Sequence, residues 1–332
     1  MSNNHSINRF VEFCFLAVIL PLLYGFISYY GYRSNYSELI YSDDLHEELF
    51  EKEVYKYRVA GKFLYDELYN FIKNNELTPH SYYIAKIKKP EQELRNEDKR
   101  YFAYYLFNNV FLLFFSISLY SVMKSRFMEL SGKELFFAHG LIVLLLCLSM
   151  FVVTFYDLPL YFLMALAYFY MLRDKSGDYI KIALLVVAGL AFRESSALII
   201  SSYTALLLTR KSKTFFKHFH KVALPLILYA VGYVALRLFF EDGDSRILSG
   251  QDNSIIAWGV AFSFFVGLGH FGLVLAGTKA RKTIFFFLIL SSPYFLLVFL
   301  GGVLFEIRLF FPLIFFIIMF LITPEKSYIS VG

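Results

Sequence analysis

The sequence predicts an all-α, polytopic transmembrane helical bundle, and three observations support this fold class. Hydrophobic residues make up 58% of the 332 residues, and aromatic residues make up 20%, whereas soluble domains are roughly 45–50% apolar. The apolar residues gather into runs that hydropathy identifies as membrane-spanning helices. Lys and Arg cluster in the short segments between these runs, as they do in cytoplasmic loops of membrane proteins. We therefore expect a single integral membrane domain over residues 1–332, with about ten spans.

The first apolar run begins close to the N-terminus. It is too long for the core of a signal peptide and lacks a small-residue cleavage site, so we expect it to be a retained first span. Hydropathy and the positions of charged turns give the full set of spans. They cover residues 10–32, 101–123, 135–155, 158–172, 179–192, 195–209, 222–240, 255–276, 284–304 and 309–322.

The long polar segment 33–100 separates the first two spans, and we interpret it as an external loop rather than a separate domain. Its apolar residues recur at near-helical intervals between Leu45 and Ile72. This pattern predicts amphipathic surface helices that lie against the membrane. The part from 73 to 99 is more polar and contains Pro79 and Pro90, so we expect a loop with short helical pieces there.

Basic residues in the short loops predict the orientation of the chain. They lie in segments 124–133, 173–175, 210–221 and 279–282. Placing these segments in the cytoplasm puts both termini there as well. The formal net charge of +5 is then accounted for by loop placement, so no nucleic-acid partner is expected. Cys14 and Cys147 both lie in apolar spans, so we expect no disulfide framework.

Two predicted spans are too short to cross a bilayer. From Lys181 to Arg193 is about twelve residues, which rise only about 18 Å as a helix, whereas the hydrocarbon core is about 30 Å thick. The span 158–172 is similarly short. Backbone that turns inside the membrane must be buried in protein or face a watered cavity. We therefore expect a recessed cavity on the non-cytoplasmic side, with Asp157, Arg193 and Glu194 near its floor.

Charged residues on the non-cytoplasmic side are the candidate functional residues, because ionisable groups at membrane depth are costly to keep. Asp43 and Asp44 follow the first span, where a desolvated carboxylate can act as a general base toward an acceptor hydroxyl. Solvated loop acids are the alternative. Arg58 can bind a phosphate at the lipid surface through its planar guanidinium, or can simply extend its charge to the interface.

Asp157 opens a short span, with Pro159 close behind it. A helix-capping role is expected from this pattern, and it is compatible with a role in a site. Arg193 and Glu194 can form a buried ion pair that only rigidifies the bundle. Alternatively, Arg193 binds a substrate phosphate, while Glu194 orients it or binds a sugar hydroxyl.

Glu306 and Arg308 precede the last span and do not share a helical face. They can either anchor the chain at the interface or contribute to substrate binding. The sequence contains no zinc-ligand spacing, no phosphate-binding glycine loop and no Walker or Rossmann pattern. We therefore expect no cofactor and no nucleotide-driven transport. The sequence does not decide whether the protein requires a divalent metal.

These motifs, in this order, resemble the multi-pass glycosyltransferases of the GT-C superfamily, which use polyprenyl-phosphate sugars. The resemblance rests on the acids after the first span, the Tyr57-Arg58-Val59 piece of a "YRVL"-like stretch, the Asp157-Leu-Pro-Leu stretch followed by residues 190–195, and Glu306-Ile307-Arg308. The chain departs from the family pattern at Ala60 and Gly61, where leucine usually follows. We also expect no soluble C-terminal domain.

The resemblance implies an enzyme that transfers a sugar from a polyprenyl-phosphate donor to a cell-surface glycan or lipid acceptor, with inversion. Asp44 or Asp43 would be the catalytic base. Arg58, Arg193 and Arg308 would contact the lipid phosphate. The implied location is the bacterial cell membrane, with membrane lipid as a further partner.

Two other function classes fit the same layout. An O-antigen or exopolysaccharide polymerase also has about ten spans and external arginines, but its large external loop usually lies late in the chain. Here the large loop follows the first span. A transporter or flippase without chemistry predicts paired broken helices in two repeats, and the sequence shows no internal repeat.

Overall fold

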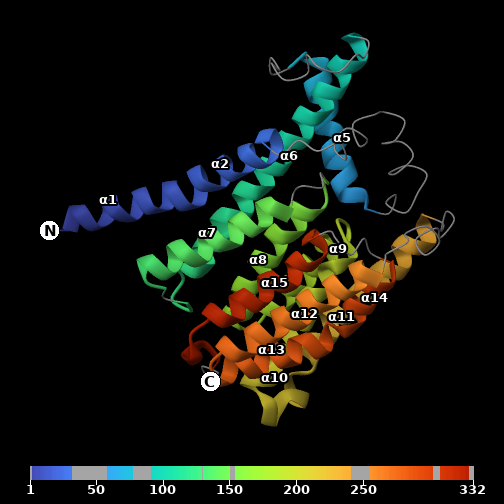
Figure 1. The fold of residues 1–332 in the computed structure, drawn as a ribbon. Coiled ribbons are helices and arrows are strands. Elements are labelled where there is room, and N and C mark those ends of the chain that lie inside the picture. The colour runs from blue at the N-terminus through green and yellow to red at the C-terminus, as the bar shows by residue number, and fades with distance from the viewer. Residues whose placement is uncertain are drawn as a thin grey trace.

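The computed structural model describes residues 2–31, 58–77, 91–128, 130–149, 154–240, 255–301 and 307–328, and every regular element in these ranges is a helix (Figure 1). The all-α prediction is therefore confirmed for the described chain. In order, the elements are α1 (Ser2–Phe13), the π-helix η1 (Cys14–Ile19), α2 (Leu20–Phe26), the π-helix η2 (Ile27–Gly31), α5 (Val59–Asn74), α6 (Glu91–Met123), α7 (Gly132–Ser149), α8 (Asp157–Arg173), α9 (Asp178–Leu190), the 3-10 helix η4 (Glu194–Ser196), α10 (Ala197–Arg210), the 3-10 helix η5 (Ser212–His218), α11 (His220–Phe239), α12 (Ile255–Leu275), α13 (Thr278–Leu290), α14 (Ser292–Gly301), α15 (Ile307–Ile322) and the 3-10 helix η7 (Glu325–Tyr328).

Four helical stretches among the described residues are long and apolar enough to cross a membrane. They cover Ile7–Tyr29, Lys99–Met123, Gly132–Ser149 and His220–Phe239, and they correspond to predicted spans 10–32, 101–123, 135–155 and 222–240. Large apolar side chains on these stretches face outward, including Phe10 at 66% and Leu238 at 76% exposure. Such exposure suits a lipid-facing surface, since soluble monomers rarely expose large contiguous apolar patches.

Helices α8, α9 and α10 confirm the expectation of short helices in the centre of the chain. They contain 17, 13 and 14 residues, fewer than the roughly 20 that a membrane crossing needs. All three pack against one another. Helices α8 and α10 are largely buried, whereas α9 exposes Ile180 and Leu184 on its outer face.

Helices α5 and α6 test the predictions for the long polar segment. An amphipathic helix is confirmed at α5, which buries Tyr65, Tyr69 and Ile72 and exposes Phe63 and Phe71. The prediction of a loop up to residue 99 is wrong at its end, because α6 already begins at Glu91. The charged residues from 91 to 100 are mostly good helix formers, so they extend the apolar helix that follows them.

The loops divide between two opposite ends of the bundle. At one end, Lys124 lies 2.8 Å from Glu12, and Arg210 donates to the carbonyl of Ser327 over 2.6 Å. These contacts join the start of the chain, the basic loops and the C-terminal segment. Helix α5 and the turn between α9 and α10 lie toward the other end. The basic loops therefore gather together, as the sequence predicts.

The turn between α9 and α10 depends on a close approach at Gly189. A Cβ at this position would lie 2.9 Å from Cβ of Ser196 and 3.0 Å from Cδ1 of Leu160. Both distances are shorter than normal van der Waals contact between carbon atoms, which lies near 3.5–4.0 Å. Glycine thus allows the end of α9 to pack against η4 and α8 together.

Gly189→Ala should lower the free energy of unfolding by about 1–3 kcal/mol, because the added methyl group overpacks this turn. Thermal denaturation of the detergent-solubilised protein would measure the change. Gly267→Ala is the matched control, since a Cβ there meets no atom within 4 Å and alanine is the better helix former. Equal melting temperatures for the two variants would refute the packing argument.

Asp174 connects two basic segments at the loop-rich end. Its carboxylate lies 2.8 Å from Nζ of Lys221 and 3.1 Å from Nζ of Lys211. Burial is the largest single influence and opposes ionisation, but the hydrogen bonds and charges of Lys221 and Lys211 together hold the pKa of Asp174 below its usual value. Ionised Asp174 therefore stabilises the packing of the turn after α8 on the start of α11.

Asp174→Asn should reduce thermal stability at neutral pH and have a diminishing effect in acid. A carboxylate with a lowered pKa contributes stability that is fully present above its unfolded pKa, near 4, and is lost as pH falls through the folded value. Melting curves of wild type and variant from pH 7 to pH 3 would measure this convergence. A constant difference across that range would exclude the ionised carboxylate as the cause.

Candidate functional site

Arg193 enters the bundle at the turn between α9 and η4. Its backbone N–H donates to the carbonyl of Gly189 over 2.8 Å, and its own backbone is extended, with φ −164° and ψ 144°. The extended residue separates two helices that would otherwise be continuous. The Arg193 side chain is only 5% exposed, so its charge requires a partner inside the protein.

Asp157 is that partner. Nη1 of Arg193 donates to Oδ1 of Asp157, and Thr154 Oγ1 donates to Oδ2 over 2.7 Å. Asp157 is the first residue of α8, where the helix dipole favours a negative charge. The capping prediction is wrong in detail, because Tyr156 holds the capping position and makes no side-chain cap. The carboxylate binds Arg193 and Thr154 instead.

Glu194 pairs with arginines from two other elements. Its Oε2 lies 3.3 Å from Nη2 of Arg58, and its Oε1 lies 3.9 Å from Nη2 of Arg237 in α11. The alternative of an ion pair between Arg193 and Glu194 is therefore wrong, because Arg193 pairs with Asp157 and Glu194 pairs with Arg58 and Arg237. Adjacent residues at an extended backbone position point apart, so each charge reaches a different neighbour.

The Tyr156 ring lies close to both buried arginines. The guanidinium carbon of Arg58 is 4.1 Å from the centroid of the Tyr156 ring, and that of Arg193 is 5.9 Å from it. The ring is almost fully buried. Cation–π contact of a desolvated guanidinium can be worth about 2 kcal/mol, which helps to offset the repulsion between the two positive charges.

Helix α5 brings Arg58 to this position because Gly61 permits a close approach. A Cβ on Gly61 would lie 3.0 Å from Cδ2 and 3.1 Å from the carbonyl oxygen of Phe155. The N–H of Ala60 donates to the carbonyl of Ala191 over 3.2 Å. Ala60 and Gly61, where the sequence departs from the family pattern, are thus the residues that dock α5 onto the turn before Arg193.

We call Arg58, Asp157, Arg193, Glu194 and Arg237, with Tyr156 among them, the charged cluster. Among the described residues it holds three arginines and two carboxylates. Planar guanidinium groups bind phosphate oxygens with good geometry.

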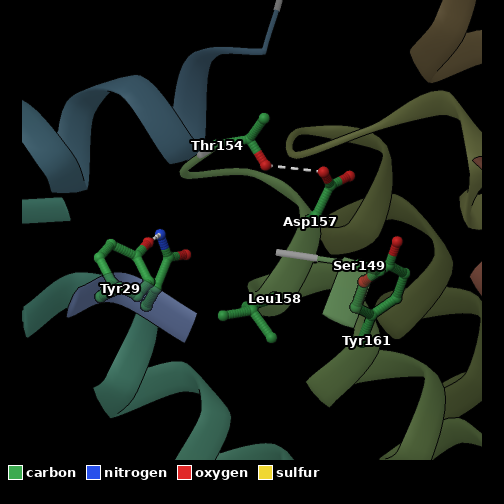
Figure 2. A pocket seen from close by; sticks show the side chains of 7 residues that line it. Tyr29, Ser149, Thr154, Asp157, Leu158 and Tyr161 are labelled. Atoms are coloured by element: carbon green, nitrogen blue, oxygen red, sulfur yellow. Dashed lines mark hydrogen bonds between the residues drawn. The ribbon is translucent and has the colours of Figure 1, made fainter. Parts of the chain in front are cut away.

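A small hollow adjoins the charged cluster at Asp157 (Figure 2). Its lining consists of Tyr29, Asn108, Ser149, Thr154, Asp157, Leu158 and Tyr161, and its empty space measures about 240 Å³ including the open mouth. Figure 2 shows the hydrogen bond between Thr154 and Asp157 at its edge, with Tyr29 and Tyr161 on opposite sides. Of the three residues expected at the floor of a recessed cavity, Asp157 lines this hollow and Arg193 and Glu194 do not. The recessed cavity on the non-cytoplasmic side stays a prediction.

The structure thus brings together four of the predicted site residues: Arg58, Asp157, Arg193 and Glu194. Asp43, Asp44 and Glu306 lie outside the described residues. Arg308 is the second residue of α15, and its side chain also lies outside the description. Within the described ranges, no group of three or more His, Cys, Asp or Glu side chains could hold a metal ion.

Sequence reasoning assigned no role to Tyr156 and Arg237. Arg237 carried a usable signal, since it is a basic residue near the end of the bundle opposite the basic loops, against the usual charge distribution. Tyr156 gave no signal beyond its position next to Asp157. Comparisons of the chain with protein families, curated proteins and solved structures give no match.

Asp157→Leu alone should destabilise the protein by about 3–5 kcal/mol, because it leaves the buried Arg193 guanidinium without its carboxylate. The double variant with Arg193→Met should recover much of this loss, since it removes the isolated charge. A denaturation cycle of wild type, both single variants and the double variant measures the coupling. Strictly additive effects would show that the pair does not interact energetically.

Proposed function

We propose that this chain is a membrane glycosyltransferase that moves a sugar from a polyprenyl-phosphate donor to a cell-surface glycan or lipid acceptor. The observation that carries the proposal is the pair of buried arginines, Arg58 and Arg193, on one tyrosine ring. The charged cluster gathers three arginines at the turn between α9 and α10, beside the amphipathic helix α5. Guanidinium groups at this position suit the phosphate of a membrane lipid.

The arginines would make the lipid phosphate a better leaving group. Guanidinium groups that are already desolvated and held by carboxylates need little rearrangement when negative charge develops on a phosphate. Asp157 and Glu194 hold those guanidinium groups in place, which leaves the role of base to another residue. Arg308 and Glu306 complete the substrate-binding residues in this proposal.

Asp44 or Asp43 would supply the base. The acceptor hydroxyl oxygen attacks the anomeric carbon as the bond from that carbon to the phosphate oxygen breaks. The hydroxyl proton passes to the carboxylate, and polyprenyl phosphate leaves with the bonding electrons. Direct attack inverts the configuration at the anomeric carbon. The reaction needs no reactant other than the donor and the acceptor.

Helix α5 supports a donor that arrives from the lipid. The helix follows Arg58 directly, packs one face on α6 and exposes Phe63 and Phe71, at 61% and 56%. An amphipathic helix of this kind suits the interface between lipid tails and headgroups. The phosphate of a membrane-embedded polyprenyl lipid would lie at the depth of this interface.

The proposal includes a topology of about ten spans in the bacterial cell membrane, with both termini cytoplasmic. Its support is the gathering of the basic loops at one end of the bundle, away from the charged cluster. The reaction would then take place on the non-cytoplasmic side, where nucleotide sugars are absent and a lipid-linked donor is needed.

Arg193→Gln and Arg58→Gln should each lower sugar transfer by about 10²-fold or more, because each removes a charged group from the developing phosphate. Mass spectrometry of cell-surface glycans and lipid-linked sugars would show loss of one monosaccharide and accumulation of its donor lipid. Arg126→Gln is the matched control, since Arg126 is exposed in a basic loop at the other end. Asp44→Ala should give the same loss if Asp44 is the base.

Other outcomes would favour other functions. Intact repeat units with collapsed chain length would identify a polymerase of lipid-linked oligosaccharides. Normal glycan composition with a lipid trapped on the cytoplasmic leaflet would identify a flippase. Unchanged glycans and lipids in correctly inserted Arg193→Gln protein would remove the charged cluster from the activity.

A further inference from the structure

The hollow beside Asp157 contains a buried acceptor that the described residues leave unsatisfied. Asn108 is only 2% exposed, and its Nδ2 donates to the hydroxyl of Tyr29. Its Oδ1 has no hydrogen-bond partner among the described residues. A buried acceptor without a donor costs about 1–3 kcal/mol. Several buried polar atoms among the described residues have no partner, and Asn108 Oδ1 is the one whose residue lines the hollow.

The hydroxyl groups around the hollow also present acceptors. Ser149 Oγ donates to the carbonyl of Leu146 over 2.6 Å, and Thr154 Oγ1 donates to Asp157 over 2.7 Å. Each hydroxyl carries one proton, so both protons are engaged while oxygen lone pairs remain. The carboxylate of Asp157 adds oxygens that can only accept. Tyr29 and Tyr161 add hydroxyl groups that can donate as well as accept. The acceptors at Asp157 and Asn108 favour a ligand group that donates hydrogen bonds.

A neutral hydroxyl group fits these requirements. Leu158 adds an apolar surface to the lining, and Tyr29 and Tyr161 add aromatic rings, which suits the mixed C–H and O–H surface of a carbohydrate. Only about 10 Å³ of the hollow can hold the centre of a water-sized group, which is roughly the room that one water molecule needs. The hollow is thus suited to a single hydroxyl group.

We propose that this hollow is a hydroxyl subsite that binds the sugar of the lipid-linked donor, with Asn108 Oδ1 and Thr154 Oγ1 as acceptors. The inference deepens the proposed function and rests on it. Asp157 joins the two parts, because one carboxylate contacts Arg193 in the charged cluster and also lines the hollow. The phosphate and the sugar of a single donor would therefore be recognised on the two sides of Asp157.

Binding measurements on the purified full-length protein test this subsite. The probes are polyprenyl phosphate without sugar and a panel of the same lipid carrying single hexoses. Wild type should bind at least one hexose-bearing lipid about tenfold more tightly than the bare lipid, because the hexose supplies hydroxyl donors to buried acceptors. Asn108→Ala should abolish this preference while leaving affinity for the bare lipid unchanged.

Asn109→Ala is the matched control. Asn109 is also buried on α6, its Nδ2 donates to the carbonyl of Tyr105, and its Oδ1 also has no hydrogen-bond partner among the described residues. Asn109 differs from Asn108 in that it does not line the hollow. Its removal should preserve the preference for the hexose-bearing lipid. Thr154→Val provides a second test with the same side-chain shape, and should reduce the preference even if Asn108→Ala fails to fold.

The outcomes separate the subsite from the proposed function. Equal affinity of wild type for bare and hexose-bearing lipids would overturn the subsite, leaving water as its occupant and the phosphate site intact. Preference retained in folded Asn108→Ala, or in Thr154→Val where Asn108→Ala fails to fold, would also overturn it. Failure of wild type to bind any polyprenyl phosphate would overturn the proposed function and the subsite together.

Discussion

The ion pair of Arg193 and Asp157 is the contact on which the rest of the site depends. It joins the turn after α9 to the first residue of α8 within the protein interior. Removing both charges from water is costly, and a buried pair is often no more stable than an apolar pair of similar volume. The presence of this ion pair among short, tightly packed helices is therefore not explained by stability. It is better explained by the fixed position that the pair gives to the two charged groups.

Contacts from several elements stabilise these buried charges and offset the cost of removing them from water. Thr154 supplies a hydrogen bond to Asp157, Tyr156 presents its ring to two guanidinium groups, and Glu194 engages Arg58 and Arg237. The elements that meet here are far apart in sequence, from the start of α5 to the end of α11. Small residues make the meeting possible, since side chains at Gly61 or Gly189 would collide with neighbouring atoms.

Much of this arrangement was predictable from residue patterns. Hydropathy identified the helical class, the basic loops indicated which turns share an end, and short apolar runs between charges located the turn at Arg193. The pairing was not predictable, because nothing in the local sequence distinguishes Asp157 from Glu194 as the partner of Arg193. Which carboxylate pairs with Arg193 depends on the directions that side chains take around the extended backbone of Arg193 itself. Asn108 was missed because a single polar residue in an apolar helix has no pattern around it, and the role of Gly61 depends on atoms of Phe155 some ninety residues away.

Tyr156 has a further consequence for how the charged cluster responds to an anion. The two guanidinium groups share one ring and belong to separate ion pairs, so a change in charge at Arg58 alters the electrostatic potential at Arg193 across that ring. In a low-dielectric interior such effects are weakly screened. Occupation of one arginine would therefore change the affinity of the other, and by thermodynamic reciprocity the reverse would also hold. Arg58 at the start of α5 and Arg193 in the centre of the bundle would then be coupled through a single aromatic side chain.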